Sequence, residues 1–259
     1  MDLLKQFLAL VFARGLTIDE KRLILTAAMK QRRADDTIAF LLQVPRDSIS
    51  SAISCLPNSK AQLYQDIAAL IYSDFKSDGF YVEFGATNGV DLSNTHMLEK
   101  YFSWHGILAE PARRWHQDLR SNRDATIEHN CVWRTSGEEL IFKETDIAEL
   151  STIDAFTDTD VNRDLRLSGS QYRVTSISLD DLLQKHNAPK QIDFLSIDTE
   201  GSELDILSTF PFERWNICFI AVEHNYSPQR EALHKLLTLN GYKRVHQNIS
   251  KFDDWYVPK

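Results

Sequence analysis

The chain has 259 residues, of which 43% are hydrophobic and 25% charged, so its length allows one large domain or one domain with an appendage. Its formal net charge is −8, but residues 1–60 hold nine Lys/Arg against six Asp/Glu, and residues 61–259 hold twenty against thirty-one. An acidic main body argues against a nucleic-acid partner, because the phosphate backbone is bound through cationic side chains. The change of charge near residue 60 predicts a boundary between two domains, 1–60 and 61–259.

Three cysteines, Cys55, Cys131 and Cys218, are too few and too scattered for a disulfide framework or a zinc site. No charged and then apolar leader opens the chain, and no apolar run approaches the ~20 residues that a membrane span needs. We therefore expect a reduced, cytoplasmic protein without a membrane span.

The first 60 residues predict a group of helices. Apolar residues over positions 3–11 recur at helical spacing, and Thr17 with Glu20 forms a capping-box pattern ahead of a second helix. A third helix must end before Pro45. Small apolar helices need a partner, so we expect them to form a cap on the main domain. A dimer interface is one alternative, and membrane-surface binding is another, disfavoured because the first helix has few Lys/Arg on its polar face.

A glycine turn after a buried strand is the central feature of the main domain. A helix over residues 61–75 is followed by Phe80–Phe84, which is aromatic and β-branched, as a buried parallel strand should be. Gly85 and Gly89 then let the backbone bend and approach a ligand where a Cβ would collide. A helix is expected from about Asp91. Ligands of open α/β sheets bind at the carboxyl end of such a strand.

Strands and helices alternate through the remainder, which predicts a doubly wound, Rossmann-like α/β sheet that is mostly parallel. The predicted strands lie at 106–109, 125–132, 139–142, 174–177, 192–197 and 217–222. Residues 242–246 and 255–257 flank a short polar turn and predict an antiparallel pair of C-terminal strands. Residues 144–170 are predicted to form an acidic loop, of the kind that serves as a lid or a substrate loop.

Polar residues follow three sets of predicted strands, at positions that a parallel sheet would bring to one crevice. They are Glu83 with the glycine turn, then Glu110, and then Asp198, Glu200, Glu223 and His224. A carboxylate at Glu110 is well placed to accept both hydroxyl groups of a ribose. Glu83 would either contact the amino-acid end of a cofactor or brace the turn.

The glycine spacing distinguishes between two nucleotide-type cofactors. A nicotinamide cofactor prefers the pattern G-x-G-x-x-G and a helix N-terminus aimed at its pyrophosphate. Here the spacing is Gly85-x-x-x-Gly89, with acids at Glu83 and Asp91. Negative charge is unfavourable beside a pyrophosphate, but it suits the cationic amino-acid end of S-adenosylmethionine.

Four segments together resemble the motif series of the FkbM-type methyltransferases. They are Glu83–Gly89, Ser93–Thr95, Ala109–Pro111 and Ile197–Glu203. The resemblance covers about residues 61–257 and leaves out the helical residues 1–60 and the acidic loop. It implies the class I methyltransferase fold, S-adenosylmethionine as the donor, and O-methyl transfer to a sugar, glycan or natural-product acceptor.

The resemblance and the strand ends together predict a set of cofactor-binding residues. In part of the family, a segment similar to the one that contains Gln62, Gln65 and Asp66 precedes the glycine motif. Asn130 and Cys131 end the predicted third strand, where an adenine edge would meet the main chain. The full set is Gln62, Gln65, Asp66, Glu83, Gly85, Ala86, Thr87, Asn88, Gly89, Ser93, Asn94, Thr95, Glu110, Pro111, Asn130, Cys131 and Asp198.

Three residues are predicted to be catalytic. Asp198 would lie near the transferred methyl group, because it ends an apolar strand that has no structural need for a charge. His224 is the predicted general base, since its unperturbed pKa of ~6.5 suits proton transfer near neutral pH. Glu200 is the third, although an acid at the start of a helix also serves as a dipole partner. These residues and Glu223 could hold magnesium or manganese, an interpretation that we do not favour.

Two other functions stay open. One is an NAD-dependent oxidoreductase, which the glycine spacing disfavours. The other is an inactive methyltransferase-fold scaffold whose residues 1–60 recruit a partner, which the intact acids at the strand ends disfavour. We expect a small-molecule or glycan acceptor, no nucleic acid, and a homodimer through residues 1–60 as one alternative.

Overall fold

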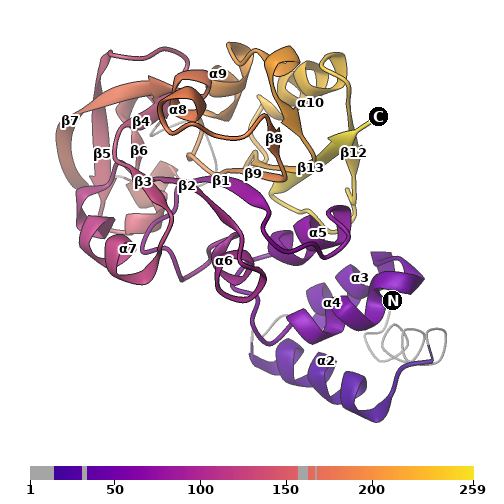
Figure 1. Ribbon diagram of the computed structural model, residues 1–259. Coiled ribbons are helices and arrows are strands. Elements are labelled where there is room, and N and C mark those ends of the chain that lie inside the picture. The colour runs from indigo at the N-terminus through magenta and orange to yellow at the C-terminus, as the bar shows by residue number, and fades with distance from the viewer. Residues whose placement is uncertain (1–14, 31–33, 157–162, 167) are drawn as a thin grey trace.

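A seven-stranded sheet runs through the part of the chain that the structure, a computed structural model, describes: residues 15–30, 34–156, 163–166 and 168–259 (Figure 1). The strand order is β12-β13-β11-β9-β1-β2-β3. The strands are β1 (Phe80–Phe84), β2 (His105–Ala109), β3 (Thr126–Glu128), β9 (Phe194–Ile197), β11 (Ile220–Glu223), β12 (Tyr242–Val245) and β13 (Asp253–Pro258).

The chain starts near the middle of this sheet and moves outward in both directions. From β1 it continues through β2 to β3, and later it returns to the other side of β1 through β9 and β11, each strand parallel to its neighbour. β13 is antiparallel to both β11 and β12. The strand order therefore reverses between β1 and β9, and the loops that leave such a switch point diverge and open a crevice. The predicted α/β class is confirmed.

Helices cover both faces of the large sheet (Figure 1). Side chains alternate between the faces, so Tyr81 and Val82 on β1 belong to different apolar clusters. Tyr81 packs in the cluster of α5 and α6, and Val82 packs in the cluster of α8, α9 and α10. The bounds are α5 (Gln65–Tyr72), α6 (His96–Phe102), α7 (His116–Asn122), α8 (Leu179–Lys185), α9 (Glu203–Ser208) and α10 (Arg230–Leu239).

A second, smaller sheet lies beside β2 and β3 (Figure 1). Its strand order is β4-β7-β5-β6, with β4 parallel to β7 and the other pairs antiparallel. A short parallel pair, β8 with β10, accompanies the large sheet. The bounds are β4 (Cys131–Trp133), β5 (Glu139–Thr145), β6 (Thr152–Ile153), β7 (Gly169–Ser178), β8 (Gln191–Ile192) and β10 (Asn216–Ile217).

The small sheet corrects two predictions. The single strand expected over 125–132 is two strands in different sheets, because the Glu128 carboxylate accepts the N–H groups of His129 and Asn130 and turns the chain there. The described residues of the acidic segment 144–170 are not a plain loop. They contain β6, the start of β7, and short 3₁₀ helices, η3 (Ala148–Leu150), η4 (Asp154–Phe156) and η5 (Arg163–Arg166).

The helix after the glycine turn begins at His96 rather than near Asp91. The Asn88 side chain accepts hydrogen bonds from the N–H groups of Val90 and Asp91, which stabilises a turn in place of a helical start. Leu92 then has a left-handed φ of +61°, so a helix cannot pass through it.

The N-terminal helices are α2 (Ile18–Lys30), α3 (Ala34–Gln43) and α4 (Ile49–Cys55). The predicted capping box is present: the Thr17 N–H donates to the Glu20 carboxylate at 2.8 Å, and the Glu20 N–H donates to the Thr17 hydroxyl at 3.3 Å. Buried side chains such as Ile24 and Phe40 belong to the same apolar cluster as α5; α3 and α4 lie nearer to α5, and α2 packs against these two helices (Figure 1). The helix predicted over 3–11 lies outside the described residues.

The remaining short 3₁₀ helices connect the longer elements. They are η1 (Arg46–Ser48), η2 (Arg113–Trp115) and η6 (Phe212–Arg214). In the ranges that the structure covers, no helix is both long and apolar enough to span a bilayer.

Gly106 allows β2 to pack closely beside β1. A Cβ at Gly106 would lie 2.1 Å from the backbone oxygen of Tyr81, an atom that cannot move without disturbing the sheet. We predict that Gly106→Ala lowers the free energy of unfolding by about 1–3 kcal/mol, measured by urea denaturation. The exposed neighbour His105→Ala is the control and should change it by less than about 0.5 kcal/mol. Equal stability of the two variants would contradict this account.

Candidate active site

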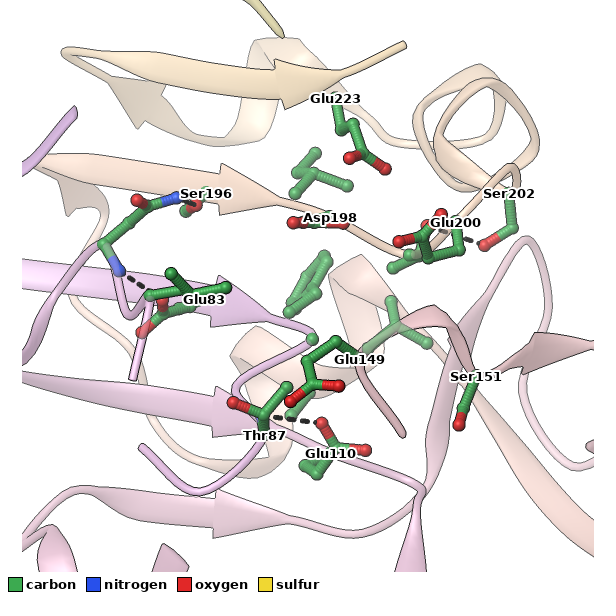
Figure 2. Close-up of a pocket in the computed structure, with 18 of the residues that line it drawn as sticks. Glu83, Thr87, Glu110, Glu149, Ser151, Ser196, Asp198, Glu200, Ser202 and Glu223 are labelled. Atoms are coloured by element: carbon green, nitrogen blue, oxygen red, sulfur yellow. Dashed lines mark hydrogen bonds between the residues drawn. The ribbon is translucent and has the colours of Figure 1, made fainter. Parts of the chain in front are cut away.

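A cavity of about 250 Å³ lies at the edge of the large sheet where the parallel strands end. Acidic residues line it in the order of the strands: Asp253, Glu223, Asp198, Glu83 and Glu110. Figure 2 shows the last four of these spread across the cavity, from Glu223 at one side to Glu110 at the other. Because β13 is antiparallel to β11, its first residue, Asp253, pairs with Glu223 at this same edge. The cavity therefore crosses the switch point of the sheet.

The turn after β1 passes against the end of β9. Gly85 has a φ of +72°, and a Cβ built on it would lie 2.1 Å from the carbonyl oxygen of Asp198. Gly89 has a φ of +78°, and its Cβ would collide with the side chains of Arg123 and Leu119 at 2.6 and 2.7 Å. Both positions require glycine because of their left-handed backbone and these contacts. The close approach expected toward a ligand is made here toward the protein itself.

Glu110 follows β2 and is held rigidly at the cavity. It is 4% exposed, and its two carboxylate oxygens accept the N–H groups of Thr87 at 2.8 Å and Ala112 at 2.7 Å (Figure 2). Burial raises the pKa of Glu110 to about 7, against the effect of these two hydrogen bonds. Each oxygen has a second lone pair, so the fixed carboxylate can accept further hydrogen bonds from a ligand.

Glu83 braces the segment that follows the glycine turn. Its buried carboxylate accepts the backbone N–H of Asn94 at 2.7 Å, the hydroxyl of Ser93 at 3.0 Å and the hydroxyl of Thr95. The Asn94 amide in turn donates to the Ser196 hydroxyl at 2.9 Å, which connects this segment to β9. The bracing contacts that the sequence allowed for Glu83 are therefore present, and the residue also lines the cavity.

Three carboxylates meet where β9 and β11 end. Oxygen atoms of Asp198, Glu200 and Glu223 all lie within 4.8 Å of one another. Burial raises the pKa of Asp198 and raises that of Glu223 well above its ordinary value, and repulsion from the neighbouring acids adds to the second effect. Oxygen donors of this kind suit magnesium or manganese. The cluster contains three of the four residues predicted as metal ligands, and His224 lies outside it.

Arg166 brings positive charge to this cluster from the acidic segment. Its side chain is fully buried, forms an ion pair with Glu200, and donates from Nε to the carbonyl oxygen of Leu150 at 3.0 Å. The Asn225 amide donates to the same Glu200 carboxylate at 3.1 Å. Glu200 is therefore held by protein partners, whereas the carboxylates of Asp198 and Glu223 lie close to each other.

His224 is not among the residues that line this cavity. Its Nδ1 accepts the N–H of Tyr226 at 2.9 Å, its Nε2 lies 3.8 Å from Asp254, and burial lowers its pKa. The ring lines a second cavity of about 210 Å³ instead. Glu223 lines both cavities, whereas His224 lines only the second of the two. His224 and Asp198, which were expected to face one acceptor, therefore line different cavities.

The other residues predicted to bind the cofactor divide into two groups. Some line the cavity: Gln62, Gln65, Thr87, Ser93, Asn94, Pro111 and Cys131. Others are not among its lining residues: Asp66, Ala86, Asn88, Gly89, Thr95 and Asn130. In this second group, Asp66 accepts hydrogen bonds from the Ser59 hydroxyl and the Ile67 N–H, so its buried carboxylate serves the start of α5.

An apolar wall of the cavity was missed by the sequence analysis. Val132, Phe142, Leu150 and Ile153 line the cavity from the small sheet and from η3. They look like ordinary core residues in the sequence, and only the packing of the second sheet beside the first brings them to this place.

Asp253 was also missed. It is 5% exposed, its carboxylate accepts the Gln65 amide at 2.7 Å, and burial raises its pKa to about 7. The sequence did contain an indication of its position. An antiparallel strand begins at the edge where the parallel strands end, so an acid at the start of the last strand lies at the edge that holds the cavity. Gln65 and Asp253 together connect the start of α5 to the sheet at the cavity.

The family model described as the methyltransferase FkbM domain matches residues 83–255. Among solved structures, the chain is similar to a methyltransferase FkbM from Methylobacillus flagellatus KT, with 14% identity and a TM-score of 0.43 over 86% of this chain and 59% of that chain. It is also similar to a precorrin-6y C5,15-methyltransferase from Geobacter metallireducens GS-15, with 10% identity and a TM-score of 0.41 over 74% of this chain and 85% of that chain. No curated protein sequence matches the chain.

The raised pKa of Asp253 predicts a pH-dependent gain in stability for Asp253→Asn. The folded protein binds a proton here up to about pH 7, whereas the unfolded chain releases it near 4, so this carboxyl lowers stability as the pH rises between these values. The stability gained by Asp253→Asn should be larger at pH 8 than at pH 5 by about 2 kcal/mol, measured by urea denaturation. The exposed Glu231→Gln is the control. The same gain at both values would show that Asp253 ionises normally.

Proposed function

The chain belongs to the FkbM methyltransferase family, and from this premise we propose that it is an S-adenosylmethionine-dependent O-methyltransferase. The proposed acceptor is a hydroxyl group of a sugar, glycan or natural product. The observation that carries the proposal is the buried carboxylate of Glu110, fixed by two backbone N–H groups beside the Gly85 turn in a cavity at the switch point. We also propose that residues 1–60 form a helical cap on a domain of residues 61–259.

The residues around Glu110 suit an adenosyl group. Glu110 would accept the ribose hydroxyls, which an ionised carboxylate binds better than a protonated one. The apolar side chains of Val132 and Phe142 would cover the adenine ring. Burial raises the pKa of Cys131 to about 12, so this residue stays neutral and serves as a small apolar wall.

The opposite half of the cavity suits the rest of the cofactor. S-adenosylmethionine supplies a methyl group on a positively charged sulfur. The carboxylates of Asp198, Glu223 and Glu83, of which the last two are buried, would favour a cationic ligand in this half, and bound cationic charge would in turn favour their ionised forms. Ser93 and Asn94 add polar groups at the side of the cavity formed by the segment after the glycine turn.

Asp198 and Glu223 would act together as the base. Their carboxylate oxygens lie close together, and like charges so near each other do not both ionise easily, so the pair would share one proton. The ionised member would accept the proton of the acceptor hydroxyl while that oxygen forms its bond to the methyl carbon; the bond from this carbon to sulfur would break, and S-adenosylhomocysteine would be the leaving group. Glu200, held by Arg166, would keep the pair in position. This pair takes the role that the sequence analysis gave to His224.

The alternatives predict different binding results. A divalent ion on Asp198, Glu200 and Glu223 is less favoured, because Arg166 already provides a cation to Glu200. Stoichiometric Mn²⁺ binding, measured by electron paramagnetic resonance and lost in Asp198→Asn, would favour it. Saturable binding of NAD without binding of S-adenosylhomocysteine would favour an oxidoreductase. Binding of neither ligand would favour a scaffold.

We predict that Glu110→Ala weakens binding of S-adenosylhomocysteine about thirtyfold, because the loss of hydrogen bonds to a buried charged acceptor costs about 2 kcal/mol. Isothermal titration calorimetry measures the change. Glu139→Ala removes an exposed glutamate of β5 and should leave the affinity as it is. Unchanged binding in Glu110→Ala would remove the ribose assignment.

We predict that Glu223→Gln slows methyl transfer at least a hundredfold with little change in the affinity for S-adenosylhomocysteine, because the variant loses a proton acceptor and keeps the shape of the side chain. The measurement is transfer of a labelled methyl group to a panel of hydroxyl acceptors. Glu231→Gln on α10 is the matched exposed control. A variant with full activity would exclude Glu223 from the base.

A further inference from the structure

One buried arginine outside the cavity connects the parts of the segment that follows the glycine turn. Arg123 comes directly after α7, and its side chain has no exposed surface. A guanidinium group has five N–H donors, and five hydrogen bonds are present here. The acceptors are Glu99 for Nε at 2.9 Å, the carbonyl oxygen of Gly89 and the hydroxyl of Ser93 for Nη1 at 3.0 and 3.2 Å, and the hydroxyls of Tyr81 and Thr95 for Nη2 at 3.0 and 2.9 Å.

Three of these five acceptors, Gly89, Ser93 and Thr95, belong to the segment between the glycine turn and α6. The hydroxyls of Ser93 and Thr95 also donate to Glu83, whose carboxylate lies 3.9 Å from Arg123 Nη1. Arg123 and Glu83 therefore form hydrogen bonds with the same two hydroxyl groups. A positive and a negative side chain, both buried, fix the position of this segment.

The segment lacks a large, buried apolar side chain. Its buried residues between Gly85 and His96 are small or polar: Ala86, Gly89, Ser93 and Thr95. Leu92, the large apolar side chain nearest to Ser93, is 47% exposed. Without a large apolar anchor, the shape of this segment depends on its hydrogen bonds.

The two ends of the turn are anchored by different groups. The N–H groups of Gly85 and Ala86 donate to the carbonyl oxygen of Ala109, and the N–H of Thr87 donates to Glu110, so the first part is attached to the end of β2. The second part, from Gly89 to Thr95, is attached to Arg123 and Glu83, and through the Asn94 amide to Ser196 of β9. The first part of the turn, at one half of the cavity, is therefore positioned by β2. The second part, at the other half, is positioned by Arg123.

We propose that Arg123 is a positioning residue, which holds residues 89–95 in the shape that receives the amino-acid end of the cofactor. It would act through Ser93 and its neighbour Asn94, which line the cavity, whereas Arg123 does not. The inference rests on the proposed function. Lysine cannot replace this arginine, because an ammonium group has three donors and lacks the planar geometry of the guanidinium.

The test compares two ligands that differ at one end. S-adenosylhomocysteine contains the adenosyl group and the amino-acid chain, and adenosine contains only the first. Arg123→Lys should raise the dissociation constant of S-adenosylhomocysteine at least tenfold and leave that of adenosine within twofold, both measured by calorimetry. Arg120→Lys, an exposed position on α7, is the matched control and should change neither.

A second variant serves if Arg123→Lys does not fold, as judged by circular dichroism. Thr95→Val removes one acceptor of Arg123 and keeps the volume of the side chain, and it should also weaken S-adenosylhomocysteine selectively. Equal weakening of both ligands would show that Arg123 has a merely structural role and would overturn the proposal, as would unchanged binding of both. If the unmodified protein binds neither ligand, the proposed function itself fails.

Discussion

The structure depends on the contact between the turn after β1 and the end of β9. Gly85 lies so close to the Asp198 carbonyl oxygen that a Cβ would come within 2.1 Å of it. This contact places the glycine turn, Glu83 and the Asp198–Glu223 pair around one small volume. Since β1 and β9 are neighbours only because the strand order reverses there, the topology of the sheet determines where the cavity can form.

The two halves of the cavity have different chemistry because different sheets supply them. The ends of β9, β11 and β13 bring buried acids, and their mutual repulsion and burial keep the pKa values of Asp198, Glu223 and Asp253 raised. The small sheet brings apolar side chains such as Phe142 to the same cavity. An elongated ligand with an apolar ring at one end and cationic charge at the other matches this division.

The predicted acids of the cavity lie at or directly after the ends of single strands. The order of Glu83, Glu110 and Asp198 along the sheet follows from an alternation of strands and helices, which periodicity reveals. Residues whose position depends on contacts between distant segments were missed, such as Phe142 on the second sheet and Asp253 on an antiparallel strand. His224 was misplaced because its spacing from Asp198 in the sequence does not say which side of β11 it faces. Arg166 lies in a segment without periodicity, so its ion pair with Glu200 had no signal at all.

One residue with a strained backbone, Tyr64, connects the N-terminal helices to the cavity. Tyr64 has a left-handed φ of +67°, a conformation that costs on the order of 1–3 kcal/mol and needs support. Its hydroxyl hydrogen-bonds with that of Thr37 at 2.6 Å, its ring packs 5.1 Å from that of Phe40, and the next residue, Gln65, lines the cavity. The stretch that defines the family, residues 83–255, is thus shorter than the unit that shapes the pocket. A graft of that stretch alone onto another protein would lack Gln62 and Gln65, which line one side of the pocket.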